Sequence, residues 1–396
     1  MHSDQAQNLL FTLAKSPDYL DPGALFPKWR FEMGRCVMLT VKSFMPLALA
    51  VVLVVGCLSI VQPDAHALTL NVFTDPHPTV SGGTIGFAFA GDKFVGSVQA
   101  DGLNVLYSTN LTGGNVQVFA PTVSIPGGSP SSEHFVTSSL GLGGFPSRDI
   151  YVAAGNGIIH INNAGTASNV FIPTSGAGSL ASAVRGILFD SIGTFGNDML
   201  VTTNGGQVYR INSAGAIVGG APLASVGEDT EGLDIAPLGT FGPHAGKLIV
   251  ASEGSGTLRA ITPGGVVTTI TTVASAEELT FVPLNLGASG NSVEGFYGAN
   301  YTDNVLKGNA SEFTGFLGDA IVTGETTHVV NRVHFDGTNF VVTNIGTFTE
   351  QPEDGIFVTA AIINPGPAVP EPATLLLLGS GLAGLFAFRY RCRNQA

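Results

Sequence analysis

Four acidic residues stand at equivalent places along the chain, each at the start of a short apolar segment. They are Glu133, Glu231, Glu277 and Asp354. If the fold brings them together, their carboxylates could bind a hard cation such as Ca²⁺, which takes six to eight oxygen ligands. Arg185 stands at the corresponding place in a further segment. Solvated turn residues or Glu–Arg pairs are therefore the competing interpretation of the same pattern.

The sequence contains no motif for nucleophilic, phosphate-binding or zinc chemistry. A Gly-x-Ser-x-Gly elbow, a Walker loop and an HExxH motif are all absent from it. Glu133 and His134 are adjacent, so on a strand their side chains would point to opposite faces. They could not then act together on one substrate atom. We therefore assign no catalytic residue.

A repeat of 46 to 52 residues must position the acidic side chains. Its copies start at Ile85, Glu133, Arg185, Glu231 and Glu277, and each holds three to four short β-branched segments separated by glycines. A period of about 40 to 50 residues with about four strands is typical of a β-propeller. Stacking such units in a ring buries faces that one unit leaves exposed. The sequence predicts an all-β, six-bladed β-propeller, with five to seven blades allowed. A pair of β-sandwiches or a right-handed β-solenoid is the alternative.

The repeat weakens after residue 300, but strand-like segments continue. Residues 319–323, 328–335 and 340–342 are predicted to be three successive strands. Residues 353–358 are predicted to form another innermost strand, with Asp354 at its start. The segment 68–73 precedes the first repeat, and we expect it to complete the last blade and fasten the ring.

The repeat resembles, in pattern only, the six-bladed propellers of the gluconolactonase-like and NHL-repeat groups over residues 85–360. The resemblance implies a metal at the axial end where the innermost strands begin, with a glutamate among its ligands. The asparagine and aspartate ligands of that group have no residue-by-residue match in this chain. No cofactor is therefore certain, and Ca²⁺ is the candidate.

Composition excludes several classes of partner and site. The chain has 16 Lys and Arg against 29 Asp and Glu, a net charge of −13. Such a surface repels nucleic-acid phosphate, so we expect no nucleic-acid partner. Cys36, Cys57 and Cys392 all lie outside the predicted propeller domain, residues 68–365. That domain therefore has no disulfide and no thiolate metal site.

The N-terminal region has the pattern of a secretory signal peptide at residues 38–67. A basic residue precedes an apolar run, and Ala65 and Ala67 provide small residues at the positions that signal peptidase tests. Cys57 allows the alternative of a lipoprotein signal. Residues 1–37 are unusual ahead of such a signal. A start codon assigned too early explains them, and the later candidates are Met33, Met38 and Met45.

The C-terminal region combines a short proline-flanked acidic segment, an apolar run and a basic end. The apolar run, residues 373–388, contains no charge and would rise about 24 Å as a helix. That is slightly short of a typical membrane span, a difference that snorkelling arginines can offset. Arg389, Arg391 and Arg393 should remain cytoplasmic. An ordinary C-terminal membrane anchor is the competing interpretation.

This tail resembles the PEP-CTERM domain of exosortase substrates in Gram-negative bacteria, over residues 369–396. The resemblance implies that an exosortase recognises Val369, Pro370, Glu371 and Pro372, with cleavage nearby. The precursor would be held transiently in the inner membrane, and its product would reach the cell surface or an extracellular matrix. Signal peptidase is the second processing enzyme, and exopolysaccharide is a candidate partner. We expect an exported protein with a non-catalytic propeller used for binding or structure. The alternative is an extracellular Ca²⁺-dependent enzyme, a lactonase, lyase or phosphoester hydrolase.

Overall fold

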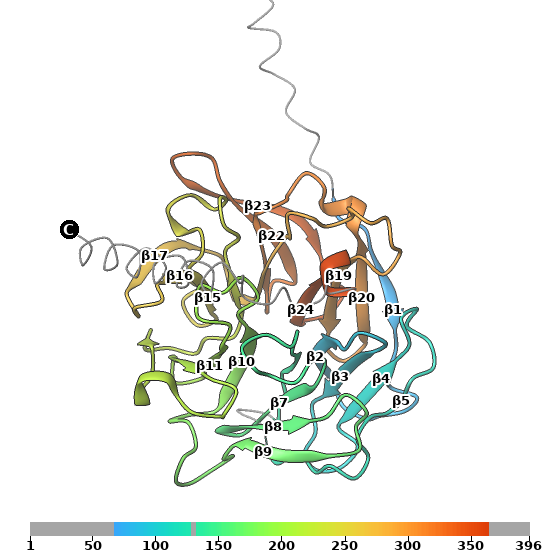
Figure 1. The fold of residues 1–396 in the computed structure, drawn as a ribbon. Helices are drawn as coiled ribbons and strands as arrows, with labels where there is room; N and C mark the ends of the chain where they lie inside the picture. The colour runs from blue at the N-terminus through green and yellow to red at the C-terminus, as the bar shows by residue number, and fades with distance from the viewer. Residues whose placement is uncertain (1–66, 128–131, 364–396) are drawn as a thin grey trace, which may run out of the picture. The chain divides into compact units, whose positions relative to one another are not determined.

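The computed structural model describes residues 67–127 and 132–363, which form six four-stranded antiparallel sheets. The sheets are the blades of a β-propeller and surround a central axis (Figure 1). The expected all-β fold with six blades is confirmed. In each of the first four blades the four strands follow one another in the chain and run from the axis outward. Their bounds are β2 Thr84–Phe89, β3 Phe94–Val98, β4 Leu106–Thr109, β5 Gln117–Val118; β6 Val136–Ser138, β7 Ile150–Ala154, β8 Gly157–Ile161, β9 Ser168–Ile172; β10 Val184–Phe189, β11 Met199–Thr203, β12 Gln207–Ile211, β13 Ala224–Ser225; β14 Leu233–Ile235, β15 Leu248–Ser252, β16 Thr257–Ile261, β17 Val267–Thr272.

The strands of the last two blades do not follow one another in chain order. The fifth sheet has the order β18-β21-β22-β23, and the sixth has the order β24-β19-β20-β1. The β19–β20 hairpin therefore leaves the fifth blade after its innermost strand and forms the middle of the sixth before the chain returns. The strands expected after residue 300 are confirmed as β21 to β24. The weakening repeat did not predict that the β19–β20 hairpin belongs to the sixth blade. The bounds are β18 Ala276–Phe281, β19 Gly295–Asn300, β20 Asn304–Asn309, β21 Ala320–Gly324, β22 Val329–Phe335, β23 Phe340–Thr347 and β24 Pro352–Val358.

The N-terminal strand closes the ring. Strand β1, Leu70–Thr74, pairs antiparallel with β20 and becomes the outermost strand of the sixth blade. The Phe73 ring lies edge-on to Phe94 of the first blade, with centroids 5.1 Å apart, and to Tyr297 of the sixth, 4.8 Å away. One short segment therefore joins the last blade to the first, as expected for residues 68–73.

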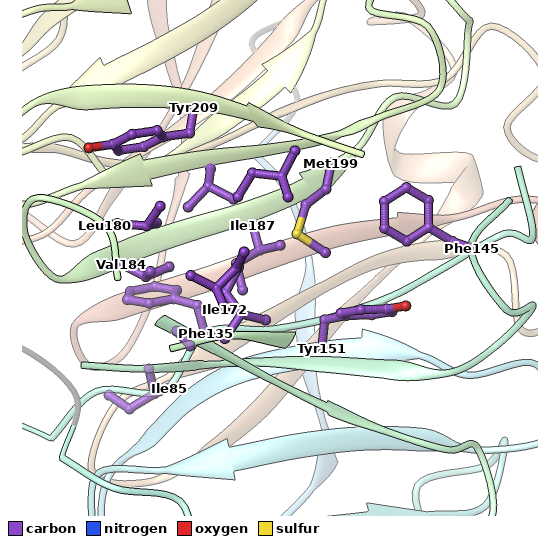
Figure 2. Close-up of a cluster of buried hydrophobic side chains, with 14 residues drawn as sticks. Ile85, Phe135, Phe145, Tyr151, Ile172, Leu180, Val184, Ile187, Met199 and Tyr209 are labelled. Carbon is purple, nitrogen blue, oxygen red and sulfur yellow. The ribbon is translucent and has the colours of Figure 1, made fainter. Parts of the chain in front are cut away.

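The hydrophobic core lies between neighbouring blades. Figure 2 shows the cluster where Tyr151 and Ile172 of the second blade meet Val184, Met199 and Tyr209 of the third. Successive strand side chains point to opposite faces of a sheet, and here each face packs against a neighbouring blade. Burying one such side chain stabilises the fold by about 1.5–3 kcal/mol. The stacked ring, and not the single sheet, is therefore the stable unit.

Four of the six innermost strands carry a one-residue bulge near their start. In β10, Val184 pairs with Thr203 but Gly186 pairs with Thr202, so Arg185 is the extra residue. The same shift of one residue occurs at the starts of β2, β18 and β24. A bulge disrupts the ladder locally and changes the direction of the side chains beside it. In β10, β18 and β24 the bulge contains charged residues, whereas in β2 it contains Ile85 and Gly86.

The remaining described elements are short. They are three 3₁₀ turns and a one-turn helix: η1 Val218–Gly220, η2 Gly242–His244, η3 Ala310–Phe313 and α2 Ala360–Ile363. Over residues 67–127 and 132–363, no helix has the length and apolar character needed to cross a membrane. Apart from Ala67, the predicted extension, signal peptide and sorting tail with its helix 373–388 lie outside the described residues.

Candidate functional site

A buried arginine surrounded by carboxylates lies at the end of the axis where the innermost strands begin. Arg185 pairs with Glu133 through Nη1 and with Glu231 through Nη2. Its Nε lies 3.4 Å from Asp229 Oδ1, and its Nη2 lies 3.6 Å from Glu253 Oε2. These residues come from the second, third and fourth blades. The guanidinium therefore draws three neighbouring blades together at the axis.

Three further carboxylates, Glu277, Glu325 and Glu353, complete this group. The Gln351 amide donates to Glu325 Oε1 at 2.9 Å and to Glu353 Oε1 at 2.8 Å. We call the whole group the acidic ring: Glu133, Asp229, Glu231, Glu253, Glu277, Glu325 and Glu353 around Arg185. Within the described part of the chain, three sets have carboxylate oxygens within 4.8 Å of one another: Asp229, Glu231 and Glu253; Glu231, Glu277 and Glu353; Glu253, Glu277 and Glu325. Such oxygen-only sets suit a hard cation.

Two of the bulges lie where adjacent acidic residues enter different surroundings. Glu277 and Glu278 together stand opposite one residue of β21, and Glu353 and Asp354 together stand opposite one residue of β19. Glu277 and Glu353 enter the acidic ring, whereas Glu278 and Asp354 line a cavity farther along the axis. At these two pairs the side-chain alternation of a regular strand is shifted by one residue.

The acidic ring cannot hold all its negative charge without a cation. Seven carboxylates and one guanidinium would carry a net charge of −6 if every group were ionised. Burial raises the pKa of Glu133 to about 7, and neighbouring carboxylates add to the shift. Burial likewise raises the pKa of Glu277 and Glu353 well above the usual range, despite the nearby Arg185 charge. The ring is therefore partly protonated at neutral pH unless a cation replaces those protons.

Buried oxygens without a hydrogen-bond partner within the described residues occur on three ring residues, Asp229, Glu231 and Glu277. Glu277 is 2% exposed, and its Oε2 is buried without a donor. A buried acceptor left unsatisfied costs about 1–3 kcal/mol. Glu277 is also shared by two of the three close-set groups of oxygens. Glu231 shares both properties, so Glu277 and Glu231 are the ring residues that a bound cation would stabilise most directly.

A cavity of about 240 Å³ follows the axis beyond the ring. Arg185 and Glu231 lie at its boundary with the ring, and more than half of its lining residues are aromatic or aliphatic. Ile362 of the terminal helix α2 also lines it, and Arg148 Nη2 donates to the Ile362 carbonyl. The apolar lining residues include Phe89, Phe135, Ile187, Leu233, Phe281, Ile356 and Phe357. We call this space the axial cavity.

Three carboxyl groups interrupt the apolar wall of the axial cavity. Asp234 accepts hydrogen bonds from the backbone N–H of Phe281, at 2.7 Å, and of Ile235. Asp354 accepts from the N–H of Phe87, at 2.8 Å, on the first blade. Each aspartate thus links its own blade to the next. Burial raises the pKa of Asp234 to about 6 and that of Asp354 to about 7, although both face the cavity. Glu278 is the third of these groups, and burial raises its pKa well above the usual range.

Three of the four predicted metal ligands come together. Glu133, Glu231 and Glu277 belong to the acidic ring, and Arg185 lies at its centre. Asp354 does not join them; its neighbour Glu353 takes that place. Glu–Arg pairing, the competing interpretation, is also present at Glu133 and Glu231. The binding of a metal by any of these residues remains a prediction.

The sequence did not predict four members of the ring. Asp229, Glu253 and Glu325 stand in turns or at strand ends that the repeat does not align. Two local signals existed: the run Glu228-Asp229-Thr230-Glu231 concentrates acidic residues beside a predicted ligand, and Glu353 is the first residue of the predicted strand 353–358. Glu253 and Glu325 gave none, because each follows the second strand of its blade, and only the stacking of blades brings those strand ends to the axis.

Residues 368–391 match the PEP-CTERM protein-sorting motif. The chain therefore carries at its C-terminal end a motif that implies export and processing by an exosortase, as expected from Val369 to Pro372. No curated protein matches the chain significantly.

The six-bladed propeller resembles solved structures of the gluconolactonase and sugar dehydrogenase kind. A Thermus thermophilus protein described as a glucose dehydrogenase has 13% identity and a TM-score of 0.46, over 72% of this chain and 90% of that chain. A protein described as a gluconolactonase has 10% identity and a TM-score of 0.46, over 74% and 86%. The PQQ-bound aldose sugar dehydrogenase of Streptomyces coelicolor has 14% identity and a TM-score of 0.45, over 77% and 96%. Such distant likeness carries no activity over to this chain.

Proposed function

We propose that this chain is an exported, exosortase-processed protein of the cell surface or extracellular matrix. Its propeller acts as a non-catalytic binding or structural body, and a divalent cation, with Ca²⁺ the candidate, stabilises it through the acidic ring. The sorting motif at residues 368–391 supports the route of export. The acidic composition suits a body displayed outside the cell, since net charge keeps a protein soluble and monomeric.

The acidic ring carries the proposal for the propeller itself. Glu231 and Glu277 are each 2% exposed and Glu353 is 3% exposed. A cation among them would be enclosed by protein oxygens, which is the arrangement of a structural site. A catalytic metal instead keeps a coordination position open for water or substrate. The burial of these three carboxylates therefore favours a stabilising cation over a catalytic one.

One observation favours a second candidate, the extracellular Ca²⁺-dependent enzyme. The axial cavity adjoins the ring at Arg185 and Glu231, so a small substrate could lie next to a bound cation. The pKa of Glu133, about 7, would suit a general base. Turnover of lactone or phosphoester substrates that depends on Ca²⁺ and is lost in Glu133→Gln would favour this candidate over the first.

Calcium titration tests the cation site. We expect the metal-free protein to bind Ca²⁺ in calorimetry and to melt at a higher temperature when Ca²⁺ is present, since a ligand that binds only the folded state stabilises it. Glu277→Gln should weaken both effects. Glu350→Gln, which removes an exposed carboxylate outside the ring, is the matched control. Absence of binding and of a melting shift in the unmodified protein would exclude the site.

Deletion of Pro370 to Pro372 tests the export route. In the native host, we expect the deletion to change the mass of the mature protein or its partition between membrane, surface and medium. A matched deletion of Asn364 to Gly366 removes three residues outside the motif and should leave processing intact. If the three proteins are cleaved at the same place, after allowance for the deleted residues, and fractionate alike, the assignment of the motif as the processing signal is contradicted.

A further inference from the structure

The axial cavity holds more carboxyl groups than cationic groups, and many apolar side chains stand between them. Its lining contains four carboxyl groups, on Glu231, Asp234, Glu278 and Asp354, and one guanidinium, on Arg185. Arg185 is already paired with Glu231. The other three carboxyl groups therefore face the cavity with no cationic side chain of the lining left to pair with them.

Glu278 is the carboxyl group best placed to meet a ligand. Asp234 and Asp354 are held by backbone N–H groups of their own and the next blade. Glu278 is 9% exposed, and the one hydrogen-bond donor to its carboxylate in the described structure is the backbone N–H of Leu279. Its charge also faces the charges of both aspartates. A carboxylate in such surroundings is strongly stabilised by a cation placed in the cavity.

A metal ion does not suit this position. In the part of the chain that the structure describes, no set of three close-lying carboxylate oxygens includes Asp234, Glu278 or Asp354. The aromatic and aliphatic residues between them provide no oxygen ligands. They do provide apolar contact and aromatic rings. Aromatic rings attract organic cations, and guanidinium groups of the chain already lie over two of them, Arg148 over Phe89 and Arg185 over Phe135. The volume of about 240 Å³ exceeds the roughly 150 Å³ of an engineered cavity that binds benzene.

We propose that the axial cavity is a binding site for a small organic cation, an ammonium group carried on an apolar body about the size of an aromatic ring with a two-carbon chain. The ammonium lies against Glu278, and the apolar body lies against the phenylalanine and isoleucine side chains toward α2. This site is separate from the acidic ring, and it does not depend on a metal being bound there.

Three probes of the same shape and different charge test the site. We expect phenethylammonium to bind the full propeller at least tenfold more tightly than phenethyl alcohol, and phenylacetate not to bind, in calorimetry with chelator present. Equal binding of the ammonium and the alcohol would show a merely apolar pocket. Binding of the carboxylate, or of none of the three, would equally overturn the proposal.

Two variants assign the contacts. Glu278→Gln keeps the shape of the side chain, and we expect it to abolish the tenfold preference for the ammonium while the alcohol binds as before. Ile356→Phe reduces the cavity volume and should weaken both probes by tenfold or more. Glu350→Gln, on the exposed surface, should change neither. An unchanged preference in a folded Glu278→Gln protein would refute the role of Glu278.

Discussion

Substitution of Arg185 by glutamine tests the electrostatic account of the acidic ring. The guanidinium is 6% exposed and lies against Glu133, Asp229, Glu231 and Glu253. Removing one partner of a buried ion pair costs about 3–5 kcal/mol, because the remaining charges are left uncompensated. We therefore expect a loss of this size in metal-free buffer, in which no other cation can replace Arg185.

The corresponding change in melting temperature follows from the size of the propeller. Unfolding entropy is about 2.1 cal/mol/K per residue, so a body of about 300 residues has roughly 0.6 kcal/mol/K. A loss of about 3–5 kcal/mol then lowers the melting temperature by roughly 5–8 °C. Differential scanning calorimetry with chelator present measures this shift directly. Added Ca²⁺ should reduce the difference between the two proteins, because the cation compensates the same carboxylates.

Arg210→Gln is the matched control. Arg210 Nε lies 2.6 Å from Asp198 Oδ2, and the arginine side chain is 26% exposed. This pair is only partly buried and involves a single carboxylate, so its loss should lower the melting temperature less than the loss of Arg185 does. If Arg185→Gln melts no lower than Arg210→Gln in metal-free buffer, the ring is not the electrostatic centre that its geometry indicates.

Three further predictions concern pH, backbone geometry and ring closure. Burial raises the pKa of Glu133 and of Asp354 to about 7, so the folded state binds more protons than the unfolded state between about pH 4 and 7. Stability in chelator should therefore fall by a few kcal/mol as pH rises from 5 to 8, and denaturation that shows the opposite trend would contradict these shifts. Gly102 and Gly113 both have positive φ, so Gly102→Ala should cost about 1–2 kcal/mol. Gly113→Ala should cost more, because only at Gly113 would an added Cβ collide with a backbone oxygen, that of Phe73. Thermal melts of the two variants give the comparison, and equal losses would exclude the close contact. Phe73→Ala should cost about 3 kcal/mol of stability, because the half-buried phenyl group contacts both the first and the sixth blade. It should also speed proteolysis at the junction of these blades. Unchanged protease resistance would mean that β1 does not close the propeller.

The sequence alone was sufficient for the repeated unit and its arrangement. Glycines between short β-branched segments, at a spacing of 46 to 52 residues, define a four-stranded unit that cannot bury both its faces. A ring of such units does bury them, which is why the six blades, the innermost strand starts and the closing segment 68–73 were predictable. The motif of Val369 to Pro372 was equally local, because a processing enzyme reads it as a short linear segment.

The composition of the acidic ring was decided by the tertiary structure. Strict alternation along β24 cannot tell whether Glu353 or Asp354 faces the ring, and the bulge opposite β19 gives the ring position to Glu353 and the cavity position to Asp354. Glu253 and Glu325 reach the axis only because their blades stack there. The placement of the β19–β20 hairpin in the sixth blade, before the fifth is complete, likewise has no local signal in the sequence. The sequence repeat determines the strands within each blade, whereas bulges and blade stacking depend on contacts between segments far apart in the chain.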